Sequence, residues 1–105
     1  MADGNYPFEV SLGYAQLTSI DASTLVSSAT FGSAPAAGIP VGTARILITP
    51  QSQAIRWRDD GTAPTATVGY PLPAGAELRY TGKGLANLRV ISQVVGAAVN
   101  MIAYG

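Results

Sequence analysis

The chain has 105 residues, of which 48% are apolar and 11% are charged, and its six basic and six acidic side chains give a formal net charge of zero. It contains neither His nor Cys, which excludes disulfides, the common zinc, copper and iron sites, and Ser-His or Cys-His catalysis. We therefore expect a single non-enzymatic domain without a cofactor or metal, and a neutral chain is not expected to bind nucleic acid or an anionic membrane.

The scarcity of charge suggests protein partners. In a typical soluble domain about a quarter of the residues are charged. This chain therefore has too few charged side chains to cover the surface of an isolated monomer in the usual way. We expect other protein to cover part of its surface. No apolar run is long enough for a membrane-spanning helix, and Met1–Tyr6 lacks the pattern of a signal peptide, so synthesis in the cytoplasm is expected.

The first part of the chain has weak periodicity. Residues 1–8 are interpreted as an extended arm, and residues 9–105 as the domain. Phe8–Leu12 alternates like a strand, whereas Leu17–Val26 is compatible with one or two strands or a short helical turn. A loop over residues 29–43 is rich in Gly, Pro and Ala. Long loops of this kind are usually functional, and we expect the arm or this loop to lie across a neighbouring subunit. The interface candidates there are Tyr6, Phe8, Phe31 and Ile39.

The second half shows short alternating segments separated by Gly and Pro. Ala44–Thr49 places Ala44, Ile46 and Ile48 on one face, and a break is expected at Pro50–Ser52. Further strands are predicted at Gln53–Arg58, Ala76–Thr81, Leu88–Gln93 and Ala97–Tyr104, with a short extended piece at Thr67–Tyr70 and a hairpin tip at Gly82–Gly84. Pro71 and Pro73 exclude a central strand between them. This pattern predicts an all-β fold, an antiparallel β-sandwich or jelly roll.

The most distinctive segment is Arg56–Thr65, which holds four of the twelve charged residues and the only Trp. Alternation places Arg56 and Arg58 on one face, before an Asp-Gly turn. In one interpretation Trp57 is in the core and the two arginines pair with Asp59 or Asp60 to hold the turn. In the other, Arg56, Arg58, Asp59 and Asp60 form a recognition edge, because a turn projects such residues from a rigid scaffold.

The string Arg56–Gly69, followed by Leu72, Ala74–Gly75 and Leu78–Gly82, resembles small virion proteins of tailed bacteriophages. The likeness covers roughly residues 44–104. It implies a capsid decoration or cement protein with a jelly-roll-like fold, located on the virion surface. Such a protein binds the outer face of the major capsid protein as a dimer or trimer and stabilises the head.

Two other functions remain open. One is a different phage structural part, such as a head-fibre base, neck or tail protein. The other is a β-sandwich that binds carbohydrate or a host surface, which would require exposed aromatic side chains on one face.

Overall fold

The computed structural model describes residues 10–105, except for the side chain of Lys83. Its elements, in chain order, are strands β1 (Ser11–Leu17) and β2 (Thr24–Leu25), the 3-10 helix η1 (Val26–Ser28), strands β3 (Arg45–Gln51), β4 (Ile55–Arg58), β5 (Tyr70–Leu72) and β6 (Leu78–Thr81), the 3-10 helix η2 (Lys83–Asn87), and strands β7 (Arg89–Ser92) and β8 (Ala98–Tyr104). In the part of the chain that the structure describes, no helix has the length and apolar character needed to cross a membrane.

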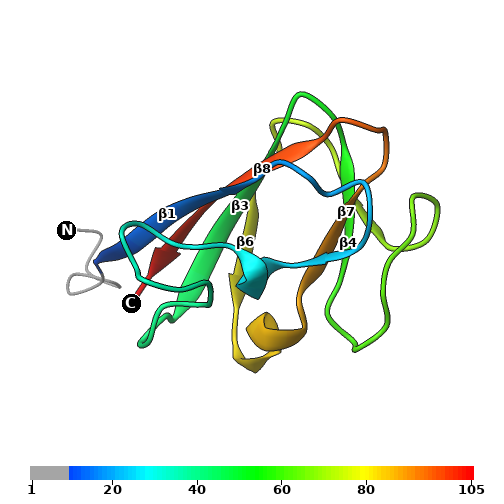
Figure 1. Ribbon diagram of the computed structural model, residues 1–105. Helices are drawn as coiled ribbons and strands as arrows, with labels where there is room; N and C mark the ends of the chain where they lie inside the picture. The colour runs from blue at the N-terminus through cyan, green and yellow to red at the C-terminus, as the bar shows by residue number, and fades with distance from the viewer. Residues whose placement is uncertain (1–9) are drawn as a thin grey trace.

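The strands form two antiparallel sheets of four strands each. Sheet A has the order β1-β8-β3-β6, and sheet B has the order β2-β7-β4-β5. Figure 1 shows the two sheets, with β1, β8, β3 and β6 in one and β7 and β4 in the other. The chain changes sheet at most of its connections, and the resulting order is that of an eight-stranded jelly roll. The predicted all-β sandwich is therefore confirmed.

The core lies between the sheets and follows the alternation of the strands. In β8, Val99, Met101 and Ala103 are fully buried while their neighbours are not, and β3 buries Ile46 and Ile48 in the same way. Sheet B contributes buried apolar side chains from three strands, namely Ile55, Leu72 and Val90. The prediction that Ile46 and Ile48 face inward is confirmed, whereas Ala44, predicted on the same face, precedes β3 and is exposed.

Strand β3 is longer than predicted, because it continues through Pro50 to Gln51. Pro50 is fully buried and pairs with Val99 of β8. On its other side β3 pairs with β6 only from Arg45 to Ile48. Pro50 therefore has no β6 residue to pair with, and the sheet tolerates its missing N–H. The turn instead begins at Ser52, which has a positive φ of 73°.

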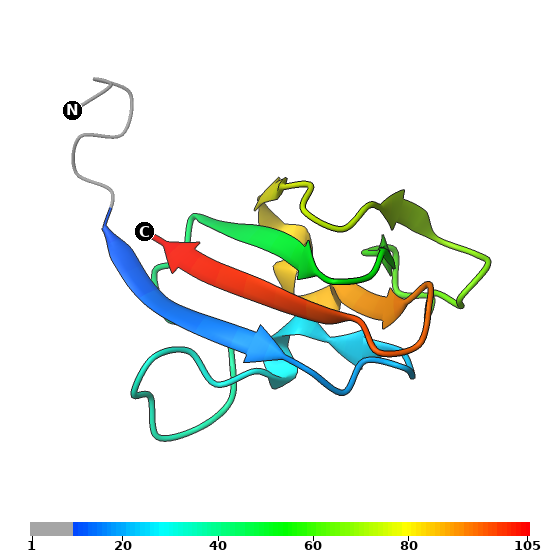
Figure 2. The ribbon, with the colours of Figure 1, turned by 90° about the horizontal axis from the view of Figure 1, so that it is seen from above.

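The loop over residues 29–43 packs against its own domain. Phe31 is 1% exposed and belongs to the core, so the expectation that it lies at an interface is corrected: its ring fills the space between the sheets. Ile39 is half-buried against the same core. The Gly32 N–H donates to the Tyr14 carbonyl at 2.8 Å, and Figure 2 shows the loop beside β1. The loop therefore covers part of the free edge of sheet A.

The other sheet edges are short or interrupted. Strand β5 contains Pro71 and lies at the edge of sheet B, in agreement with its exclusion from a central strand, and β2 has two residues. Gly82–Gly84 is not the tip of a hairpin, since η2 carries the chain from β6 in sheet A to β7 in sheet B. Such edges disfavour strand addition, so partners are expected to meet side chains on the faces and loops.

Candidate functional site

The loop over residues 59–69 joins β4 to β5 and stands out from the sandwich on the right of Figure 1. The side chains of β4, the strand before this loop, point alternately to the core and to the outer side of the sheet. Ile55 is fully buried and Trp57 packs on the core, whereas Arg56 and Arg58 alternate with them and lie on the outer side of sheet B. The two arginines thus share a face, as predicted, and both reach the loop.

Arg56 binds the backbone of this loop. Its Nε donates to the Ala66 carbonyl at 3.1 Å and its Nη1 donates to the Gly69 carbonyl at 2.8 Å. Gly69 has a φ of 144°, and a Cβ at this position would lie 3.1 Å from the Cβ atoms of Arg56 and Pro64. One guanidinium therefore fixes two points of a loop that has no regular hydrogen-bond ladder. Position 69 requires Gly, because of its positive φ and its close approach to Arg56 and Pro64.

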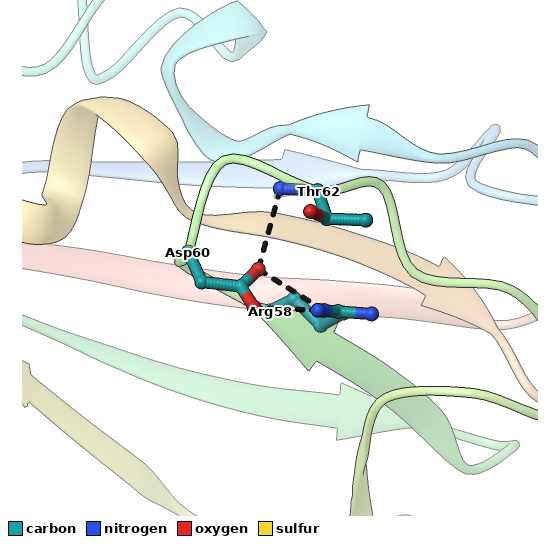
Figure 3. A network of polar contacts seen from close by, with 3 residues as sticks. All are labelled: Arg58, Asp60 and Thr62. Atoms are coloured by element: carbon teal, nitrogen blue, oxygen red, sulfur yellow. Dashed lines mark hydrogen bonds and ion pairs between the residues drawn. The ribbon is translucent and has the colours of Figure 1, made fainter.

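Arg58 and Asp60 form a two-point ion pair at the start of the loop (Figure 3). Nε donates to Oδ1 at 3.0 Å and Nη2 to Oδ2 at 2.5 Å, and the Thr62 N–H donates to Oδ1 at 3.3 Å. The hydrogen bond from Arg58 lowers the pKa of Asp60. This arrangement matches the interpretation in which the charged residues hold the turn.

Asp59 instead connects the two sheets. Its Oδ2 accepts a hydrogen bond from the Tyr80 hydroxyl of β6 at 2.5 Å. Tyr80 is 9% exposed, and its burial, together with the Asp59 carboxylate, raises its pKa to about 12. Gly84 of η2 makes room for this contact, because a Cβ there would lie 1.9 Å from the Tyr80 hydroxyl oxygen.

Three aromatic rings meet beside the loop. The Trp57 ring lies 5.5 Å from Tyr70, tilted by 42°, and 6.1 Å from Tyr80 in an edge-to-face arrangement. Tyr70 is 67% exposed, whereas the indole Nε1 of Trp57 is buried without a hydrogen-bond partner. A hollow of about 350 Å³ opens here, lined by Trp57, Arg58, Asp59, Asp60, Val68, Gly69 and Tyr70. We call it the Trp57 hollow.

A second surface is the outer face of sheet A, which sequence reasoning did not identify. Two rows of side chains cross its strands, Tyr14–Ile102–Leu47 and Gln16–Asn100–Thr49, with Gln51 beside the second. We call these seven residues the neutral face. None of them carries a formal charge.

A hydrogen-bond network orders the polar part of the neutral face. The Tyr14 hydroxyl donates to Asn100 Oδ1 at 2.5 Å, and Gln51 Oε1 accepts from Gln16 at 3.1 Å and from Asn100 at 3.0 Å. At its border, Arg45 lies over the Tyr104 ring at 5.0 Å and Arg79 pairs with Glu77 at 3.0 Å. Groups that are already positioned lose less entropy when a partner binds.

The structure brings together four of the eight interface candidates, Arg56, Arg58, Asp59 and Asp60, and gives each a partner within the domain. It separates Phe31 and Ile39 from them, and Tyr6, Phe8 and the arm of residues 1–8 lie outside the described residues. Among residues 10–105, no three His, Cys, Asp or Glu side chains gather where they could hold a metal ion.

No protein-family model matches the chain, and neither a curated protein nor a solved structure matches it significantly.

Proposed function

We propose that this chain is a capsid decoration protein of a tailed bacteriophage, which binds the outer surface of the major capsid protein through the neutral face of sheet A. The observation that carries the proposal is this face: its seven side chains are uncharged, and hydrogen bonds already order its polar groups. The resemblance of residues 44–104 to small virion proteins supplies the class of partner. The jelly-roll order is compatible with this role but does not identify it, because the fold has many functions.

The placement of the charged residues supports an uncharged contact. Arg56 and Arg58 bind groups of their own loop, and Asp60 is paired with Arg58. A capsid subunit that recruited the paired atoms of these side chains would have to break these bonds first. Ile102 lies at the centre of the neutral face and Leu47 beside it on β3, and both are half-buried, so covering them removes apolar surface from water without stranding a charge.

The size of the face favours many weak contacts over one strong contact. The face crosses three strands and runs for at most five residues along one of them, Leu47–Gln51 of β3, so it spans about 14 Å by 17 Å, roughly a third of what a stable interface of two free proteins buries on each side. A repeated lattice, or an oligomer that engages several sites at once, compensates for this through effective concentration. Binding to the assembled shell then stabilises that shell by mass action.

The experiment that tests the proposal mixes the purified protein with phage particles that lack it. The measurements are the number of copies bound per particle and the temperature at which the particles release DNA. We expect saturation on the order of hundreds of copies and a higher release temperature, as for occupancy of the whole lattice. A dozen copies or fewer would instead indicate a neck, tail or fibre protein, and the absence of binding would refute a role on the particle surface.

A further inference from the structure

The Trp57 hollow is lined by residues of β4, β5 and the loop between them, whereas the neutral face belongs to sheet A. It stays open when the neutral face is covered. We propose that this hollow is a binding site for a neutral sugar ring. The inference does not depend on capsid binding, since it concerns different residues on the other sheet.

The apolar wall of the hollow offers exposed aromatic and aliphatic surface to a ligand. Tyr70 and Trp57 form a cross-strand pair, and the planes of their rings are tilted by 42° instead of being parallel. Tyr70 is 67% exposed and Val68 is 53% exposed. The C–H face of a pyranose is apolar, and it gains from contact with an aromatic face in the same way as other apolar groups do.

The polar wall offers donors and acceptors side by side. Arg58 uses Nε and Nη2 on Asp60, which leaves Nη1 able to donate. Asp59 uses Oδ2 to accept from Tyr80, which leaves Oδ1 able to accept. A sugar hydroxyl both donates and accepts, so neighbouring hydroxyls match an arrangement in which a guanidinium and carboxylates lie together.

The charges around the hollow do not select an ion. Arg58 and Asp60 neutralise each other, and Asp59 remains as a negative charge held by the Tyr80 hydroxyl. Two further positive charges lie nearby. Arg56 is hydrogen-bonded to the loop backbone, and Arg89 of β7 lies opposite Arg58 in the strand register. Neither sign dominates. A ligand that is polar but uncharged therefore fits better than a cation or an anion.

The site is also formed before a ligand arrives. Arg56 holds the two loop carbonyls next to the hollow, the Thr62 N–H holds Asp60, and Tyr80 holds Asp59. A volume of about 350 Å³ is at the low end of the range for small-molecule sites, which suits one ring and not a long oligosaccharide. Affinity for a free monosaccharide should be on the order of millimolar, because the ligand is small and the site is open.

The test titrates the intact protein with D-glucose, D-galactose, D-mannose and N-acetyl-D-glucosamine, each up to about 50 mM, well above the expected dissociation constant. Trp57 is the only Trp, so its fluorescence reports on the hollow directly. Amide chemical shifts of residues 68–70 provide a second readout. We expect a saturable change with at least one of the four sugars. If none of them gives a saturable change in either readout, the proposal is wrong.

Matched variants locate the binding. Tyr70→Ala removes an exposed ring from an edge strand and is expected to weaken binding at least about tenfold, as for loss of a stacking partner. Tyr70→Phe keeps the ring and should bind within about threefold of the wild type. The control is Tyr14→Ala, which removes a 52% exposed ring from the other sheet and should bind like the wild type. Equal affinity of Tyr70→Ala and Tyr14→Ala would overturn the assignment, and so would tighter binding of D-glucuronate than of D-glucose.

Discussion

The hydrogen bond between Tyr80 and Asp59 links the two sheets beneath the loop, and Tyr80→Phe removes it while keeping the ring. A bond to a charged group contributes about 1.5–3 kcal/mol. Tyr80→Phe should therefore lower the free energy of unfolding at pH 7 by roughly 2 kcal/mol.

The assay is urea unfolding followed by the fluorescence of Trp57, with Tm as a second measure. A loss of about 2 kcal/mol in a domain of this size lowers Tm by roughly 8–16 °C. The control is Tyr14→Phe, which also removes a Tyr hydroxyl bonded at 2.5 Å, but from a side chain that is 52% exposed. It should cost less than about 0.5 kcal/mol, because water replaces the lost partner.

The burial of Tyr80, together with this bond, predicts an alkaline transition. The folded state holds the Tyr80 proton more tightly than the unfolded state does, so the stabilisation is complete below pH 10 and is lost as the pH rises towards 12. The difference in stability between the wild type and Tyr80→Phe should therefore shrink over this interval. If Tyr80→Phe unfolds within about 0.5 kcal/mol of the wild type at pH 7, and the difference does not change with pH, the reasoning about this bond is refuted.

Three further predictions concern positions that hold the loop and the core. Gly84→Ala should lower the free energy of unfolding by about 1–3 kcal/mol, because a Cβ would overlap the Tyr80 hydroxyl. Measured by chemical denaturation, this loss should be smaller in the Tyr80→Phe background. If the effects of the two substitutions simply add, the contact is contradicted. Arg56→Ala should raise the rate of proteolytic cleavage within residues 59–69 at least several-fold, since it frees two carbonyls of the loop; an unchanged rate would mean that Arg56 does not hold the loop. Phe31→Ala should lower the stability by about 3–5 kcal/mol, because its ring is buried in the core, and a loss below about 1 kcal/mol in thermal unfolding would restore a surface role.

The strands were predictable where every second side chain is buried. Ala44–Thr49 and Ala97–Tyr104 alternate in sequence, and β3 and β8 lie there with Ile46, Ile48, Val99 and Met101 inside. The extent of β3 was not predictable, because the tolerance for Pro50 depends on where the neighbouring strand β6 ends. That is a property of the assembled sheet and leaves no local signal.

The role of Phe31 was missed for a similar reason. A segment rich in Gly, Pro and Ala indicates a loop, and residues 29–43 contain no strand longer than a single bridge. Composition does not show whether one aromatic side chain in such a loop points to solvent or to the core. A large aromatic residue in a loop made mostly of Gly, Pro and Ala was the available signal.

The candidate site was predictable only in its local part. Asp60 and Thr62 lie within four residues of Arg58, and turn chemistry indicated their contacts. The bond between Asp59 and Tyr80 joins residues 21 positions apart, and the bond between Tyr14 and Asn100 joins residues 86 positions apart. Only the order of the strands brings these pairs together, so neither the Trp57 hollow nor the neutral face was visible in the sequence.

The most direct test of the central claim compares capsid binding of two variants that each place an arginine on an apolar surface position. Ile102→Arg puts a charge at the centre of the neutral face, and Val41→Arg puts one on a loop residue that is 99% exposed. Both proteins are mixed with particles that lack the chain, and the copies bound per particle are counted after sedimentation. The account predicts that Val41→Arg binds like the wild type and that Ile102→Arg loses at least about tenfold in affinity, because burying an unpaired charge is costly. Equal binding of the two variants would contradict it.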